Sequence, residues 1–205
     1  MIRVDDTGDV WTVTLARPDK ANSLTEAMLT DLRDTARRAS GARALILTGE
    51  GKVFSAGADL QAAKAGLAVS PLWEELSSAI AALPGLTIAA LNGTLAGGAV
   101  GMALACDLRI AVPTARFFYP VMKLGFLPQP SDPGRMAALI GPARTKLILM
   151  GGQKIDAETA YAYGLIDRIV APDALMAEAQ TLTEDTVAAK PDIALGIKRM
   201  CAPRA

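Results

Sequence analysis

Short apolar runs alternate with longer amphipathic segments along the whole chain. Residues 10–15 (VWTVTL) alternate in polarity and are rich in β-branched side chains, so they predict a strand that ends before Pro18. Other runs are short, apolar and closed by turn residues, which is typical of buried strands. These predicted strands and one short extended piece cover 43–49, 87–93, 108–112, 165–170 and 115–120.

The amphipathic segments predict helices. In residues 22–39 the apolar side chains recur at helical spacing, and Ser23 or Thr25 can cap the first turn. Further helices are expected at 72–83, stopped by Pro84 and Gly85; at 97–107; as a pair around Gly141–Pro142 within 132–152; at 156–164, capped by Asp156 and stopped by Gly164; and from 173 onward.

Alternation of covered strands with helices predicts an α/β fold. We expect a core domain at 1–171 and a C-terminal helical segment at 172–205, because the composition changes only after Pro172. A chain of 205 residues is long enough to bury a sizeable core.

Composition narrows the classes of partner. Lysine plus arginine and aspartate plus glutamate number 21 each, so we expect no nucleic acid partner. The acidic start lacks a signal core, and no apolar run reaches the ~20 residues of a membrane span, so no membrane partner is expected. The two cysteines lie far apart, which indicates reduced thiols and a cytoplasmic protein.

The chain contains no histidine. This excludes Ser-His-Asp and Cys-His catalysis and removes imidazole ligands, and no metal site is expected. Acid–base chemistry must therefore come from a carboxylate, tyrosine, lysine, cysteine or bound water.

Two glycine-rich turns, 51–60 and 92–101, each follow a buried strand and lead toward a helix. Small residues at a helix start let a ligand approach unpaired backbone N–H groups. If the turns converge, two N–H groups could form an oxyanion hole suited to a thioester carbonyl that becomes an enolate. The alternative is that these glycines only permit tight turns and close packing. Neither turn matches a nucleotide-binding signature.

Several ordered segments resemble the crotonase superfamily, also called the enoyl-CoA hydratase/isomerase family. They are LARPDKANSLT, ALILTGEGKVFSAGADL, TIAALNGTLAGGAVGMALACDLRIA, FFYPVMKLGFLP, KLILMGGQKIDAETAYAYGLIDRIV and PDIALGIKRM. The resemblance implies a ββα spiral, a coenzyme A thioester as ligand, no permanently bound cofactor, and a homotrimer or hexamer.

The same resemblance implies roles for particular residues. The oxyanion hole would be formed by the backbone N–H groups of Ala58 and Gly98. Coenzyme A would contact the loop positions Lys20, Ala21, Ala56, Asp59 and Leu60.

The sequence departs from the family at the positions where hydratases carry glutamates. The two matching positions are Gly101 and Val121, and an acid used by some relatives matches Gln129. Neither glycine nor valine can act as an acid or base, so we expect weak hydration or none. The family's further C-terminal helices are not matched, which predicts a more open pocket or one completed by a neighbouring subunit.

Few candidates for acid–base chemistry remain. Asp132 could turn toward the pocket, or it could cap the helix that begins near Pro133. The hydroxyl of Tyr119 could donate a proton, although packing is the simpler role. Glu74 and Glu75 are expected on a solvated helix face, and Cys106 in the core. Two alternatives to hydration stay open: a different enolate reaction, and a non-catalytic acyl-CoA binding subunit.

Overall fold

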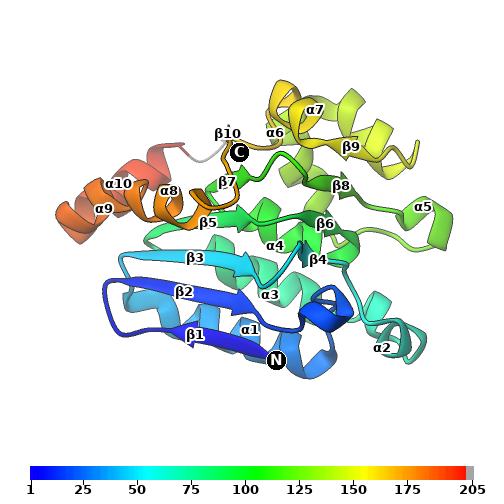
Figure 1. The fold of residues 1–205 in the computed structure, drawn as a ribbon, viewed down its shortest axis with the longest axis horizontal. Coiled ribbons are helices and arrows are strands. Elements are labelled where there is room, and N and C mark those ends of the chain that lie inside the picture. Colours follow the sequence, from blue (N-terminus) through cyan, green and yellow to red (C-terminus); the bar gives the residue numbers. More distant parts are fainter. Residues whose placement is uncertain (202–205) are drawn as a thin grey trace.

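Two β-sheets form the centre of the protein in this computed structural model, which describes residues 1–201 (Figure 1). The larger sheet has six strands in the order β1-β2-β3-β5-β7-β10, with β1 antiparallel to β2 and the other pairs parallel. Its strands are Ile2–Asp5, Val10–Leu15, Ala44–Gly49, Leu86–Leu91, Leu108–Ala111 and Arg168–Ile169. The smaller sheet contains β4 (Val53–Ser55), β6 (Thr94–Ala96), β8 (Arg116–Phe118) and β9 (Ile155–Asp156).

The chain winds through these sheets in a repeated strand–strand–helix unit. Each turn places one strand in the larger sheet, a short strand in the smaller sheet, and then one or two helices. The turns are β3-β4-α2-α3, β5-β6-α4 and β7-β8-α5-α6. The predicted α/β fold and its ββα spiral are confirmed.

Ten α-helices lie in the described part of the chain. They are α1 (Glu26–Arg38), α2 (Leu60–Lys64), α3 (Leu72–Ala81), α4 (Val100–Ala105), α5 (Val121–Leu124), α6 (Asp132–Leu149), α7 (Ala157–Tyr163), α8 (Leu175–Thr181), α9 (Glu184–Ala188) and α10 (Pro191–Cys201). Three short 3-10 turns bear on the site: Pro18–Lys20, Leu67–Val69 and Gly97–Ala99.

Local signals in the sequence set several boundaries correctly. Thr25 caps α1 by accepting a hydrogen bond from the N–H of Met28. Asp156 caps α7, which ends at Gly164 in the left-handed conformation. Gly141 interrupts α6 with non-helical backbone angles, so this segment is the predicted pair of helices. The pattern did not predict β1 or the three-residue strands β4 and β6.

The core lies between the larger sheet and the helices α1, α3 and α4. Every residue of α4 is buried, so this helix runs through the interior rather than along the surface. Leu175 and Ala179 of α8 are buried in the same core, and Lys198 of α10 donates to Asp107 at 2.7 Å. The division into a core domain at 1–171 and a C-terminal segment at 172–205 stays a prediction. Residues 202–205 of the C-terminal segment lie outside the described ones.

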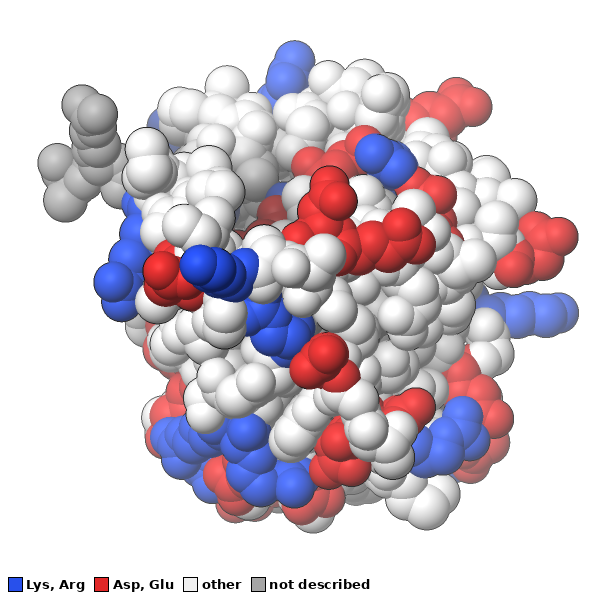
Figure 2. All heavy atoms as spheres, turned by 90° about the vertical axis from the view of Figure 1, so that its left-hand side faces the viewer, with Lys and Arg blue, Asp and Glu red and all other residues white. Residues whose placement is uncertain are grey.

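Charged side chains of both signs are interspersed over the face that Figure 2 shows. That face corresponds to the left-hand side of Figure 1, where α8, α9 and α10 lie. Within residues 1–201, no helix combines the length and the apolar character needed to cross a membrane.

Candidate functional site

The two glycine-rich turns meet at the ends of β4 and β6. These strands run parallel and pair with one another. A Cβ added to Gly57, whose φ is +90°, would lie 2.9 Å from the carbonyl oxygen of Ala96 and 3.2 Å from Cα of Gly97. Only glycine suits both this conformation and this close approach. The contact brings the segments that carry Ala58 and Gly98 side by side.

The backbone N–H groups of Ala58 and Gly98 are both free to bind a ligand in the described structure. Both residues are partly exposed, although their neighbours Gly57 and Ala99 are buried. Gly98 lies in the 3-10 turn that leads into α4, where N–H groups lack partners within the helix. Across residues 1–201, no hydrogen bond from the Ala58 N–H is found.

Two asparagine side chains hold the turns in place, which the sequence analysis did not anticipate. Buried Asn22 donates to the carbonyl oxygens of Glu50 and Val53 at 2.9 and 2.7 Å. Asn92 accepts the N–H of Gly49 at 3.0 Å. Asparagine suits this position because one side chain both donates to and accepts from turn backbone.

Two glycines, one helical turn apart, face large side chains from other elements. A Cβ on Gly98 would lie 3.1 Å from the indole ring of Trp73, on α3. A Cβ on Gly101 would lie 2.7 Å from Oδ1 of Asp132, at the start of α6. Gly101 has no carboxylate of its own, and the carboxylate of Asp132, from a different helix, lies against it instead.

The side chain of Asp132 points into the protein rather than capping α6. It is 0% exposed, and Oδ2 accepts a hydrogen bond from the Tyr119 hydroxyl at 3.0 Å. Oδ1 has no hydrogen-bond partner among the described residues. Of the two roles considered for Asp132, the helix cap is wrong: Ser131 occupies the N-cap position, and α6 has no side-chain cap hydrogen bond. The physical reason is that Gly101 leaves room for the carboxyl group inside.

Burial shifts the ionisation of this pair. The pKa of Asp132 is raised to about 6, mainly by burial, while the Tyr119 hydrogen bond and the charge of Arg135 oppose the rise. The pKa of the Tyr119 hydroxyl is also raised, first by burial and then by the Asp132 charge. Tyr119 is both packed, at 4% exposed, and hydrogen-bonded, so its hydroxyl remains a donor.

The two glutamates of α3 differ in their surroundings. Glu75 fits a solvated helix face, because its partly exposed carboxylate pairs with Arg33 at 2.8 Å. For Glu74 that expectation is wrong, since its carboxylate accepts the N–H of Ser131 at 3.1 Å and also the Ser131 hydroxyl. Although burial raises the pKa of Glu74, these bonds hold it below its usual value.

The residues matched to a coenzyme A site lie along one rim. The N–H of Ala56 donates to the carbonyl oxygen of Ala21 at 3.0 Å, which joins the two loops. Lys20 is exposed beside them, and Leu60 is 80% exposed. Asp59 is already engaged, because it caps α2.

A half-buried arginine, absent from the sequence predictions, organises the same rim. Arg17 pairs with Asp59 at 2.9 Å and also donates to the carbonyl oxygen of Ser23. The Arg17 hydrogen bond is the main cause that lowers the pKa of Asp59. Asp59 therefore fixes the loops rather than offering a free carboxylate.

The remaining sequence candidates are interior side chains. Cys106 is buried, which raises the pKa of its thiol to about 12, and its Sγ donates to the carbonyl oxygen of Met102. Val121 and Gln129 are also buried. Within residues 1–201, no group of three or more His, Cys, Asp or Glu side chains could hold a metal ion.

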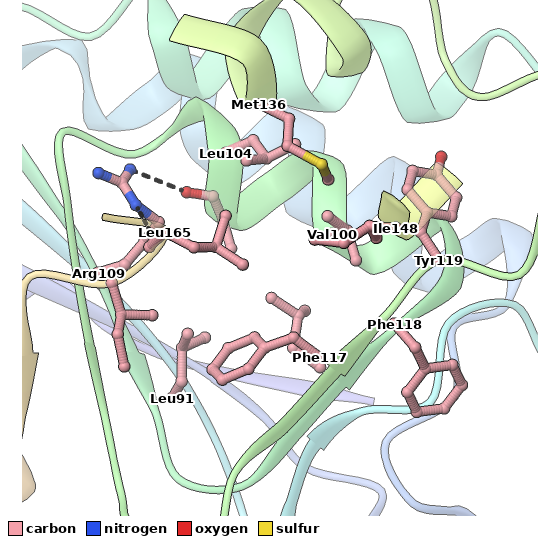
Figure 3. Close-up of a pocket in the computed structure, with 13 residues that line it drawn as sticks. Leu91, Val100, Leu104, Arg109, Phe117, Phe118, Tyr119, Met136, Ile148 and Leu165 are labelled. Carbon is pink, nitrogen blue, oxygen red and sulfur yellow. Dashed lines mark hydrogen bonds between the residues drawn. The ribbon is translucent and has the colours of Figure 1, made fainter. Parts of the chain in front are cut away.

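An apolar cavity of about 20 Å³ lies under α4 (Figure 3). Figure 3 shows it between Leu104 and Phe117, with Arg109 at one end and Tyr119 at the other. A space of this size compares with one water molecule, and an apolar lining keeps such a space dry. The cavity cannot hold an acyl chain as it stands.

Comparison with known proteins decides the family. The family model described as Enoyl-CoA hydratase/isomerase matches residues 5–202. The chain belongs to the enoyl-CoA hydratase/isomerase family.

Relatives and solved structures support this membership. The chain is 32% identical over 197 residues to the "Probable enoyl-CoA hydratase echA6" of Mycobacterium leprae, covering 93% of this chain and 78% of the relative. The crystal structure of an enoyl-CoA hydratase from Bacillus anthracis superposes with a TM-score of 0.88 at 32% identity, covering 97% of this chain and 81% of that one. The structure of Pseudomonas aeruginosa DspI gives a TM-score of 0.87 at 30% identity, covering 97% and 85%.

Within the enoyl-CoA hydratase/isomerase family, this chain combines a glycine at 101 with a buried carboxylate at 132. The spiral fold places both at the same side of α4. Sequence reasoning named Asp132 as a candidate, but nothing local in residues 129–134 signals that it packs on Gly101.

Proposed function

We propose that this chain binds an acyl-CoA thioester and stabilises its enolate with the backbone N–H groups of Ala58 and Gly98. The observation that carries the proposal is the contact between Gly57 and Gly97, because it brings both turns to one point. One preorganised donor aimed at a developing oxyanion is worth about 3 kcal/mol of the barrier. Two donors from separate turns suit a thioester oxygen.

Asp132 is the proposed base for the α-proton. Its carboxyl group packs on Gly101. Gly101 lies about one helical turn after Gly98, or about 5 Å along the helix axis. With a pKa of about 6 it is mostly ionised at neutral pH and still basic enough to accept a proton. The carboxylate takes the α-proton, the C–H electron pair forms a carbon–carbon double bond, and the carbonyl oxygen becomes the enolate oxygen.

The rim of loops around Ala21 and Ala56 is the proposed coenzyme A contact. Lys20 is exposed there, and an ammonium is a suitable point charge for a phosphate. Ala56, Asp59 and Leu60 line the same edge. Coenzyme A enters as part of the substrate, and a cytoplasmic homotrimer or hexamer completes the proposal on the basis of the family alone.

Hydration of an enoyl thioester is expected to be weak. It requires one group to activate water and another to protonate the α-carbon. Asp132 supplies one carboxyl group. The Tyr119 hydroxyl already donates its hydrogen bond to that same carboxyl group, so it is not a separate second group. A second candidate, acyl-CoA binding without turnover, is favoured by the complete burial of Asp132.

The test separates binding from enolate formation. Butyryl-CoA is incubated with the protein in heavy water, and loss of the α-proton signal is followed by NMR, while calorimetry measures binding of butyryl-CoA and of free coenzyme A. We expect exchange by the wild type, loss of exchange with retained binding in Asp132→Asn, and normal exchange in Asp173→Asn, an exposed control.

Three other results would decide against parts of the proposal. Binding without exchange in the wild type would favour the non-catalytic function. Equal exchange in Asp132→Asn would remove Asp132 as the base. No preference for butyryl-CoA over free coenzyme A would contradict recognition of the acyl group.

A further inference from the structure

The carboxylate of Glu74 is fully used in joining two helices. Oε2 accepts the N–H of Ser131 at 3.1 Å, and Oε1 accepts the hydroxyl of the same serine. Oε1 also accepts the hydroxyl of Ser78, one turn further along α3, at 3.1 Å. Hydrogen bonds to a charged acceptor are about twice as strong as neutral ones. The contact therefore fixes Ser131 relative to α3.

Ser131 directly precedes Asp132 and is the N-cap residue of α6. The chain before it, residues 122–127, is exposed throughout and includes the protruding Leu127. A segment with few buried contacts opens easily, so the start of α6 needs a fixed point. Glu74 of α3 supplies that point through its two bonds to Ser131.

Helix α3 links both halves of the proposed site. Trp73 lies against Gly98, and its ring nitrogen donates to the carbonyl oxygen of Leu67 at 2.7 Å. The next residue, Glu74, holds Ser131 and therefore also the adjoining backbone from which the Asp132 side chain extends. One helix thus sets the position of a carboxyl group relative to the oxyanion turn.

We propose that Glu74 is a positioning residue, which acts through Ser131 to keep the Asp132 carboxyl against Gly101. The inference rests on the proposed function only in giving Asp132 a catalytic role. Glu74 itself does not touch the substrate.

The charges around Asp132 determine in which direction its pKa should change when Glu74 is replaced. The groups that face it are the Tyr119 hydroxyl, the Arg135 guanidinium and the Glu74 carboxylate. Burial raises the pKa of Asp132 most, the hydroxyl and the guanidinium lower it, and the negative charge of Glu74 raises it further. Removing that charge must therefore lower the pKa, and any added exposure to water acts in the same direction.

The test uses Glu74→Gln beside Glu75→Gln as a matched control. Glu75 is the next residue on the same helix and pairs with Arg33 instead. The Asp132 pKa is read by carbon-13 carboxyl NMR of aspartate-labelled protein, with the signal assigned by Asp132→Asn. In Glu74→Gln we expect the Asp132 pKa to be lower than in the wild type. We also expect exchange of butyryl-CoA slowed about tenfold through kcat with KM unchanged. Glu75→Gln should match the wild type in both.

A second pair of variants keeps the test valid if Glu74→Gln does not fold. Ser131→Ala removes only the hydroxyl bond and should slow exchange, whereas Ser131→Thr retains the hydroxyl and should restore it. An unchanged Asp132 titration in Glu74→Gln, with or without a lower melting temperature, would overturn the inference. If the wild type exchanges no α-proton but the titration still shifts, the proposed function fails and the positioning role stands.

Discussion

At the scale of single residues, Asp132 is held in a state that favours chemistry over stability. Its carboxyl group is buried, has one hydrogen bond from Tyr119, and leaves Oδ1 without a partner in the described structure. A buried polar atom without a partner costs on the order of 1–3 kcal/mol. Stability lost at one residue is typical of functional sites, where strained or unsatisfied groups are retained.

The ionisation of Asp132 predicts how stability depends on pH. Its pKa is raised from 3.8 to about 6 in the folded protein, so the folded state binds the proton more tightly than the unfolded state. This tighter proton binding stabilises the folded state in full below about pH 4, and the stabilisation is lost as the pH rises through about 6. Asp132→Asn, which resembles the protonated form, should therefore be more stable than the wild type at pH 7, by about 2 kcal/mol.

Urea unfolding from pH 4 to pH 8 measures this difference. The advantage of Asp132→Asn should shrink as pH falls toward 4, while the exposed Asp173→Asn should show no such trend. A variant that is less stable than the wild type at pH 7 would show that the ionised carboxylate stabilises the fold.

At the scale of elements, the sequence predicts what local periodicity and capping determine. The helix α1, the strands β2, β3 and β5 and the break at Gly141 follow from spacing and turn residues alone. The strands β4 and β6 have three residues each, too few for a period to show. The sequence left two orientations of Asp132 open, because an aspartate before Pro133 looks locally like a cap, and the room that decides between them lies at Gly101.

The break in α6 gives a prediction about backbone conformation alone. Gly141 has φ 79° and ψ 159°, and a Cβ there would meet nothing within 4 Å. Gly141→Ala should lower the free energy of unfolding by about 2 kcal/mol through backbone strain. The matched control is Gly134→Ala on the same helix, which also has open space but no positive φ. It should be neutral or stabilising by up to about 1 kcal/mol. Equal effects in the two variants, measured by thermal unfolding, would contradict this account.

At the scale of the whole molecule, each turn of the spiral delivers one part of the proposed site. In the first turn, the strands β3 and β4 lead to Ala58; in the second, β5 and β6 lead to Gly98; in the third, β7 and β8 lead to α6 and Asp132. Figure 1 shows the three short strands side by side, so the parts meet although they lie far apart in the sequence. Backbone donors in tight turns that follow packed strands are held in place, which suits stabilisation of developing charge.

The central claim is that the N–H groups of Ala58 and Gly98 polarise a thioester carbonyl. The most direct test is difference infrared spectroscopy of butyryl-CoA labelled with carbon-13 at its carbonyl, bound and free. The account predicts a lower carbonyl stretching frequency in the complex, because two hydrogen bonds weaken the carbon–oxygen double bond. A bound thioester whose carbonyl frequency equals that of the free ligand in water would contradict it.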